Sequence, residues 1–365
     1  MAAIDEIFRV IKEQGASDLH MASGSQPMVR LSNELVPVDY GQLTPELNRK
    51  LLYELMTPEQ VTDFERDKEI DFGHEVPGVT RLRCNIFEQR NGIAAVFRLI
   101  PTTILTCEQL ALPQQIINFT EAPRGLVVVT GSTGSGKSTT LAAMVNRINE
   151  RDSRHILTVE DPIEFVHENQ RSLVNQREIG TNTMSFSNAL RAALREDPDI
   201  ILVGEMRDLE TIQLAITAAE TGHLVFGTLH TNSAAGTVDR IIDVFPTDQQ
   251  EQIRVMLAEG LRGVIAQRLL ARRDGQGRIA AFEILVVTAA ISNLIREGKT
   301  FQIESMLQTG KKDGMIALEQ SLQELVMNGL VEVTEAARHS GNPAHFLKTC
   351  PGASSGSPSL EYVRS

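Results

Sequence analysis

Residues 131–138 read Gly-Ser-Thr-Gly-Ser-Gly-Lys-Ser, a complete G-x-x-x-x-G-K-[ST] phosphate-loop pattern. An apolar run at 126–129 precedes it and a helix-like stretch from Thr139 follows it. In such a strand–turn–helix unit, backbone N–H groups and the positive helix end bind phosphates. Lys137 would reach the β- and γ-phosphates, and the Ser138 hydroxyl would ligate Mg²⁺. The predicted site for ATP or a close relative consists of Gly131, Ser132, Thr133, Gly134, Ser135, Gly136, Lys137, Ser138 and Thr139.

A carboxylate follows a second apolar run. Glu205 comes after Ile200–Val203 and Gly204, and the carboxyl ends of parallel strands are where open sheets bind ligands. Glu205 could act on Mg²⁺ through water, or orient and deprotonate the attacking water. The alternative is an ordinary acidic residue at the start of the next helix. We predict that Glu205 is catalytic.

Three further carboxylates fall within five residues, in the segment Glu160-Asp161-Pro162-Ile163-Glu164. We predict that Glu160 and Glu164 belong to the nucleotide site and that Glu160 helps hold Mg²⁺ or its waters opposite Ser138. The alternative is a solvated turn whose corner is set by Pro162.

Two histidines, His223 and His230, flank the predicted strand Leu224–Thr228. A neutral imidazole at a strand end can hydrogen-bond a γ-phosphate or its bound water and report whether it is present. Spacing alone leaves this role and an ordinary structural role equally open. Both histidines are candidate site residues, and metal ligation is disfavoured because no cysteines lie near them.

Phosphoryl transfer needs cationic side chains near the negative charge that develops on the phosphate, and Lys137 supplies one such charge. Exposed salt bridges are the usual role of an arginine, so the sequence does not choose among the candidates. If an arginine from the first hundred residues reaches a neighbouring subunit's nucleotide, the site is completed only in a ring. The candidates are Arg81, Arg83 and Arg98 in that region, and Arg195, Arg207 and Arg240 further along the chain.

With 365 residues, the chain is long for one domain. The sequence predicts a small α+β domain at residues 1–100, a linker at 101–115 and an α/β core at 116–288. It further predicts a helical appendage at 289–348 and a disordered tail at 349–365. In the first domain, apolar spacing predicts helices at Asp5–Gln14 and Pro45–Met56. Asn91-Gly92 predicts a hairpin turn between strands Thr80–Phe87 and Ile93–Ile100.

From Ile116 onward, apolar strands alternate with helices, which is typical of a doubly wound, parallel-rich sheet. The predicted strands are Leu126–Thr130, His155–Val159, Ile200–Val203, Leu224–Thr228 and Ile279–Leu285. The predicted helices include Ser187–Arg195, Asp208–Glu220 and Gln249–Arg272, the last because Ile253, Leu257, Val264 and Ile265 suggest one apolar face.

The composition is that of a globular protein, with 42% hydrophobic residues. A formal net charge of −12 disfavours a sequence-independent nucleic-acid partner. Cys84, Cys107 and Cys350 form no C-x-x-C pair, so reduced thiols and no zinc framework are expected. No apolar stretch is long enough to span a bilayer, and the N-terminus is unlike a secretion signal. We expect a cytoplasmic protein without direct membrane insertion that can dock on a membrane partner.

Four ordered segments together resemble the secretion ATPase superfamily, in particular its type IV pilus retraction motors, the PilT class. The segments match the Walker A, Asp box, Walker B and His box of that superfamily, and the resemblance runs from Gly15 to about Leu330. The four segments are 131–138, 158–165, 197–208 and the stretch from 221–223 to 230–232.

The resemblance implies a RecA-like core behind a PAS-like N-terminal domain, assembled into homohexamers. It implies Mg²⁺-dependent ATP hydrolysis that turns an inner-membrane platform protein of the PilC type and disassembles the pilus. It also implies catalysis by Glu205, γ-phosphate sensing by His230, and contacts in trans by the first-domain arginines. The lack of C-x-x-C favours retraction over extension, because extension motors usually carry a tetracysteine zinc module.

One departure from the family pattern lies at Ser292, within Ala-Ile-Ser-Asn-Leu-Ile-Arg-Glu at 290–297, where retraction motors carry arginine. From its apolar spacing alone, this stretch is a short amphipathic helix that packs against the core. Four alternatives to a principal retraction motor stay open: an accessory retraction paralogue, an extension or type II secretion ATPase, a non-hydrolysing nucleotide switch and, weakest, a nucleic-acid translocase.

Overall fold

The computed structural model describes residues 4–31, 34–100 and 103–350. The chain divides into two compact units, Met1–Ile104 with Pro162–Val166, and Leu105–Asp161 with His167–Ser365. The predicted tail, apart from 349 and 350, lies outside the described residues. Among the described residues, we find no helix with the length and apolar character that a membrane span requires.

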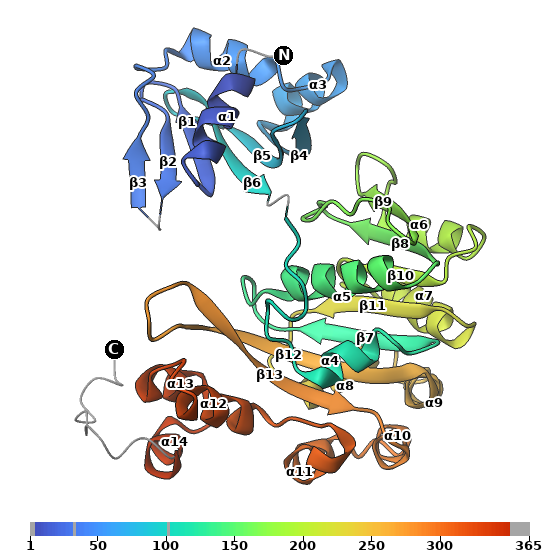
Figure 1. The fold of residues 1–365 in the computed structure, drawn as a ribbon. Coiled ribbons are helices and arrows are strands. Elements are labelled where there is room, and N and C mark those ends of the chain that lie inside the picture. The colour runs from blue at the N-terminus through green and yellow to red at the C-terminus, as the bar shows by residue number, and fades with distance from the viewer. Residues whose placement is uncertain (1–3, 32–33, 101–102, 351–365) are drawn as a thin grey trace. The chain divides into compact units, whose positions relative to one another are not determined.

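The first unit is built on an antiparallel sheet, as Figure 1 shows in blue. The predicted hairpin is present, since β5 pairs with β6 across a turn at Arg90 and Asn91. Helix α1 packs on the sheet through Phe8, whose ring meets that of Phe97 edge-on at 5.0 Å. The sheet order is β3 (Glu34–Pro37), β2 (Met28–Leu31), β1 (Asp18–Ala22), β6 (Gly92–Ile100), β5 (Thr80–Gln89) and β4 (Glu69–Val76), and the helices are α1 (Asp5–Glu13), α2 (Pro45–Tyr53) and α3 (Pro58–Asp67).

The second unit contains the predicted parallel-rich sheet. Six of its strands run parallel, and only the edge strand β13 is antiparallel to its neighbour. The order is β13 (Arg278–Val286), β12 (Leu261–Ala271), β7 (Gly125–Thr130), β11 (Leu224–Leu229), β10 (Ile200–Val203), β8 (His155–Glu160) and β9 (Leu173–Glu178). This confirms the predicted α/β class, with a parallel-rich core following a smaller α+β unit.

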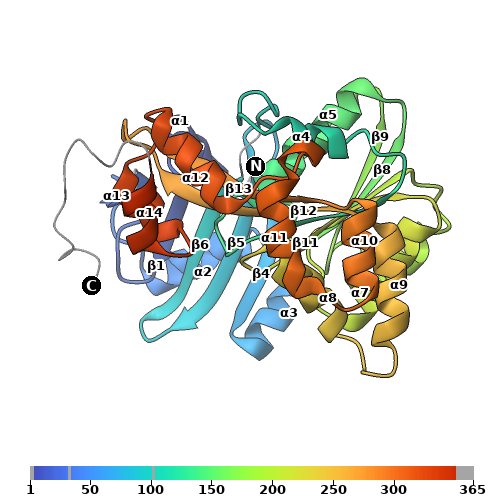
Figure 2. The same cartoon turned by 90° about the horizontal axis from the view of Figure 1, so that it is seen from below.

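Helices cover both faces of this sheet (Figures 1 and 2). Along β7, Val127 and Val129 join the apolar cluster of α4 and α5, whereas Leu126 and Val128 join the cluster of α7, α8 and α9. A strand buried on both faces reads as a continuous apolar run, which is why it was visible in the sequence. The helices are α4 (Gln114–Phe119), α5 (Lys137–Arg151), α6 (Phe186–Ala193), α7 (Leu209–Glu220), α8 (Ala234–Asp243) and α9 (Gln250–Gly260).

The predicted helix Gln249–Arg272 is wrong in its second half. Helix α9 ends at Gly260, and the chain continues as the eleven-residue strand β12. Gly263 has no room for a side chain, because a Cβ there would lie 2.1 Å from Cζ of Phe119. Residues 263–266 are buried between β7 and β13, so they lack the polar alternation that marks a half-exposed strand.

Beyond β13 the chain is helical, as predicted. Helix α10 buries Ile291 and Ile295 in the main core, in agreement with the packing interpretation of this stretch. Helices α12 to α14 share a separate apolar cluster with β12 and β13. Helix α14 extends to Thr349 and Cys350 is buried, so ordered packing continues into the start of the predicted tail. The remaining elements are α10 (Ala289–Arg296), α11 (Ile303–Thr309), α12 (Leu318–Met327), α13 (Val333–His339) and α14 (Pro343–Thr349).

Candidate nucleotide site

The phosphate loop joins β7 to the start of α5, as its sequence predicts. Gly131 and Gly136 have φ of 144° and 88°, values that side-chain-bearing residues rarely adopt. A Cβ on Gly131 would also lie 2.4 Å from the backbone oxygen of Gln267 in β12. The loop therefore packs directly on β12, and glycine at position 131 permits that approach.

The loop carries polar groups that could donate hydrogen bonds to a phosphate. Lys137 is buried, and its ammonium group donates to the carbonyls of Gly131 at 2.9 Å and Ser132 at 3.2 Å. Ser135 Oγ is buried and, within the described part of the chain, has no hydrogen-bond partner. A buried hydroxyl without a partner is costly unless a ligand satisfies it. These groups fit a bound phosphate.

The strand register brings His230 and Glu205 together beside this loop. Strand β11 lies between β7 and β10, and its last residue, Leu229, pairs with Thr130 of β7. His230 Nε2 lies 3.0 Å from Glu205 Oε1. The Glu205 side chain is only 20% exposed and also bonds the exposed guanidinium of Arg207. One edge of the sheet thus holds a carboxylate, an imidazole and the phosphate loop.

Glu160 ends β8, which is three strands from β7, or about 14 Å at the usual strand spacing. Its Oε1 accepts hydrogen bonds from Thr158 at 2.6 Å and Gln176 at 3.1 Å. Of the two roles predicted for Glu160, holding Mg²⁺ itself or holding its waters, this spacing favours the second. Glu164 is exposed, in the segment Pro162–Val166 that groups with the first unit.

His223 is placed at the wrong edge for a phosphate contact within its own chain, which corrects the prediction. It precedes β11, and its carbonyl accepts from the N–H of Gly125, the first residue of β7. The length of a six-residue strand, about 20 Å, separates that edge from His230. The imidazole Nδ1 lies 2.9 Å from the carbonyl of Ala218, so it satisfies an end group of α7.

The first-domain arginines have partners within their own unit. Arg98 Nε bonds Asp18 Oδ1 at 3.0 Å across β1 and β6, and Arg83 Nε lies 3.8 Å from Asp71 Oδ1. The side chains of Arg98 and Arg83 are 66% and 44% exposed. Exposed pairs of this kind contribute little to folding stability and leave a guanidinium able to exchange partners. Arg81 lies on the same strand as Arg83.

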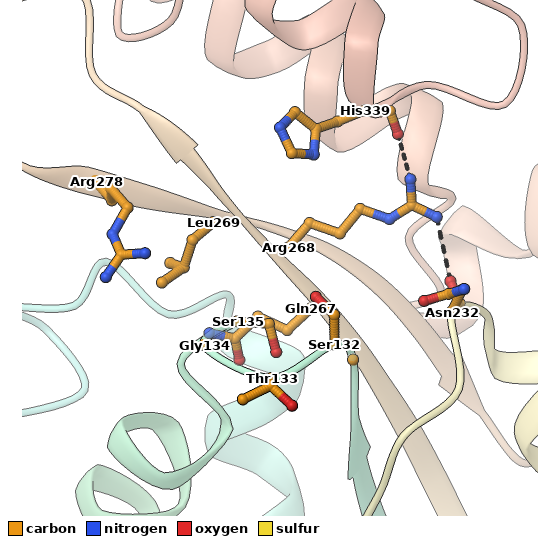
Figure 3. A pocket seen from close by; sticks show the side chains of 11 residues that line it. Ser132, Thr133, Gly134, Ser135, Asn232, Gln267, Arg268, Leu269, Arg278 and His339 are labelled. Carbon is orange, nitrogen blue, oxygen red and sulfur yellow. Dashed lines mark hydrogen bonds between the residues drawn. The ribbon is translucent and has the colours of Figure 1, made fainter. Parts of the chain in front are cut away.

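A cleft of about 400 Å³ opens on the β12 side of the phosphate loop, and Figure 3 shows the side chains that line it. Sequence reasoning missed this wall because it assigned residues 261–271 to a helix. The run Gly-Val-Ile-Ala at 263–266, rich in β-branched residues after Gly260, was the available signal for a strand. The lining residues are Gly131, Ser132, Thr133, Gly134, Ser135, Asn232, Gln267, Arg268, Leu269, Arg278 and His339.

Comparison with known proteins shows similarity over most of the chain. The family model described as type II/IV secretion system protein matches residues 2–338. A type IV pilus retraction ATPase, PilT of Pseudomonas aeruginosa, is 52% identical over 94% of this chain and 99% of its own length. A twitching motility protein of Neisseria gonorrhoeae is 54% identical over 87% of this chain and 84% of its own.

Among solved structures, a crystal structure of the pilus retraction motor PilT with bound ADP superposes with a TM-score of 0.88. It is 47% identical in sequence and covers 94% of this chain and 98% of its own. The match extends over both units and the C-terminal helices, well beyond the phosphate loop that many unrelated proteins share. This chain belongs to the type II/IV secretion system protein family, the secretion ATPases.

Proposed function

We propose that this chain is an ATPase motor that hydrolyses ATP to drive type IV pilus retraction. The observation that carries the proposal is the Glu205–His230 pair at the edge that holds a complete phosphate loop: His230 follows β11, the neighbour of β7, and Glu205 follows β10, the next strand. A protein that only binds nucleotide needs the loop but not a carboxylate positioned to act on water. The high identity to a retraction ATPase along nearly the whole chain supports the biological role.

The nucleotide would be held through its phosphates by the loop N–H groups and Lys137. Mg²⁺ typically takes one or two protein ligands and completes its shell with phosphate oxygens and water. Among the described residues, no group of three or more histidine, cysteine or acidic side chains is suited to hold a metal ion. The Ser138 hydroxyl at the start of α5 fits as the protein ligand, with Glu160 acting through water. When bound, Mg²⁺ would neutralise developing phosphate charge.

Glu205 would accept the proton of the attacking water or hold that water in line. His230, at 3.0 Å from Glu205, would hydrogen-bond the γ-phosphate or the water and so link its presence to the position of β11. Arg207 neutralises Glu205 in the present arrangement, because its guanidinium bonds the same carboxylate oxygen. Turning Arg207 away toward phosphate or solvent would free that oxygen to accept a hydrogen bond from water.

The assembled motor would be a homohexamer in which arginines of the first unit (Arg81, Arg83 or Arg98) complete a neighbouring subunit's site. The pair of Arg83 with Asp71 supports this for Arg83, because both side chains are exposed and the guanidinium can exchange partners at low cost. Arg98 has an exposed guanidinium but pairs with the buried carboxylate of Asp18. We further propose that the ring works at the cytoplasmic face of the inner membrane, at the pilus base. There it would turn a platform protein of the PilC type.

The test is a count of surface pili and a twitching assay in a strain that lacks this gene, complemented with wild type or Glu205→Gln. A retraction motor predicts excess pili without motility, corrected by wild type alone. Bald cells would indicate extension. Rescue by Glu205→Gln would show that nucleotide binding suffices and would overturn the ATPase proposal. Normal pili and motility without the gene, but a defect when a second motor is also removed, would indicate an accessory paralogue.

A further inference from the structure

The four residues that follow His230 are held from both sides. Thr231 lies against the end of β7: its N–H donates to Thr130 Oγ1 at 2.8 Å, and the two hydroxyls lie 2.7 Å apart. Thr130 is the last residue before the phosphate loop. The segment Thr231–Ala234 is therefore fixed on one side to the strand that carries the loop, and it leads on its other side into α8.

Arg268 of β12 holds the same segment from the opposite side. Its guanidinium donates to the carbonyl of Asn232 at 3.3 Å and to the carbonyl of His339, the last residue of α13. Figure 3 shows the side chain spanning these two backbone oxygens. A planar guanidinium with several fixed donors suits such a bridge, and a lysine ammonium would not reproduce it.

Glu283 of β13 makes the second bridge. Its Oε1 accepts from the N–H of Ala234 at 2.7 Å, which satisfies a free donor at the start of α8. Burial raises the pKa of Glu283, and its hydrogen bond from the Ala234 N–H opposes that rise. The Glu283 side chain therefore connects β13 to the first turn of α8.

These contacts tie the geometry of the site to the C-terminal helices. Arg268 and Glu283 lie on neighbouring strands and both bond the segment after His230, and Arg268 also bonds the last residue of α13. We propose that Arg268 and Glu283 are positioning residues, which hold Thr231–Ala234 so that His230 stays beside Glu205. The proposal rests on the proposed function, because it assigns their effect to ATP hydrolysis. It makes α13 part of the support of the catalytic pair.

Steady-state ATP hydrolysis by the full-length protein tests this proposal. We expect Arg268→Gln and Glu283→Ala to lower kcat about tenfold and to change KM for ATP less than twofold. Glu283→Gln keeps an oxygen that can accept from Ala234, so it should recover several-fold of the loss. Arg272→Gln is the matched control, because Arg272 follows β12 directly and its guanidinium pairs with Asp274 on the exposed β12–β13 turn. Its kcat should equal that of wild type.

A double variant separates positioning from a general loss of structure. If Arg268 acts through His230, then Arg268→Gln combined with His230→Asn should have the kcat of His230→Asn alone. Multiplied losses would overturn the proposal. A raised KM with unchanged kcat would also overturn it, because Arg268 would then bind nucleotide directly.

Amide hydrogen exchange gives a readout that does not depend on hydrolysis. Peptides covering 231–236 should exchange faster in Glu283→Ala and in Arg268→Gln than in wild type, with no change in Arg272→Gln. Unchanged exchange would contradict the positioning role. If wild type itself hydrolyses no ATP, the proposed function fails, while the exchange result still decides whether these two residues hold the segment.

Discussion

The two ends of strand β11 carry the same residue type in opposite settings. At its carboxyl end, His230 lies 3.0 Å from Glu205 and next to the phosphate loop. At its amino end, the imidazole of His223 bonds the carbonyl of Ala218 in the last turn of helix α7. All strands from β12 to β9 run in one direction, so one edge gathers the polar groups that follow strands and the other gathers helix ends. Chemistry is expected at the first edge and stability at the second.

The largest expected effect comes from removing the ammonium group at the carboxyl edge. Lys137→Ala should weaken ATP binding at least a hundredfold, because the phosphates lose their only buried cation within the loop. Isothermal titration with a non-hydrolysable ATP analogue measures this. Lys299→Ala is the control, since Lys299 makes an exposed pair with Glu297 and should leave affinity unchanged. Wild-type affinity in Lys137→Ala would show that the loop does not bind the nucleotide.

The histidine pair tests the comparison directly. His230→Asn should lower kcat for ATP hydrolysis between tenfold and a hundredfold, on the order of what a positioned acid–base group contributes. His223→Asn should change kcat less than twofold and lower the melting temperature slightly, because the Ala218 carbonyl loses the imidazole but keeps the His223 N–H and the Thr221 hydroxyl as donors. Equal losses of activity in both variants would mean that strand direction does not separate function from stability.

Two glycines with positive φ sharpen the same contrast. Gly131→Ala and Gly222→Ala both place a side chain at φ above 120°, but only at Gly131 does the new Cβ meet a backbone atom, at 2.4 Å. We expect Gly131→Ala to weaken ATP affinity about tenfold, as the loop shifts away from β12. Gly222→Ala should lower stability and leave affinity unchanged. Thermal unfolding and ATP titration of the two variants check this, and unaltered affinity in Gly131→Ala would contradict it.

The smallest expected effect is electrostatic and lies at the amino edge. Burial and the nearby charge of Glu259 raise the pKa of Glu220. A carboxyl group whose pKa is raised on folding stabilises the protein at low pH, and this contribution is lost as pH rises through the raised value. Glu220→Gln should therefore raise the melting temperature at pH 7, with a smaller gain at pH 4 and unchanged kcat. A lower melting temperature at pH 7 would contradict this reading of the edge.

The site was readable from sequence where a short pattern fixes its own geometry. The phosphate loop contains its glycines, lysine and serine within eight residues, and Glu205 and His230 each directly follow an apolar strand. Parallel strands then bring these segments to one edge without further information. The same logic places His223, which precedes strand β11, at the opposite edge, so its choice as a candidate site residue did not follow from the strand direction.

Apolar periodicity did not predict strand β12, which lines one side of the cleft beside the phosphate loop. Residues 263–267 are buried and follow a helix without an intervening proline, so the spacing of their apolar side chains resembled that of a continuing helix. The error hid Gln267 and Arg268, which line the cleft, and the contacts of Arg268 with Asn232 and His339. These contacts join residues far apart in the chain, which no local pattern encodes.

We propose that ATP hydrolysis at the carboxyl edge of the sheet depends on the carboxylate of Glu205. The most direct test measures ATP affinity and steady-state phosphate release in parallel for wild type and Glu205→Gln. The account predicts affinity within threefold of wild type and a turnover at least a hundredfold lower, because the substitution keeps the shape and removes the base. Turnover close to that of wild type would contradict the account and would assign the chemistry to another residue.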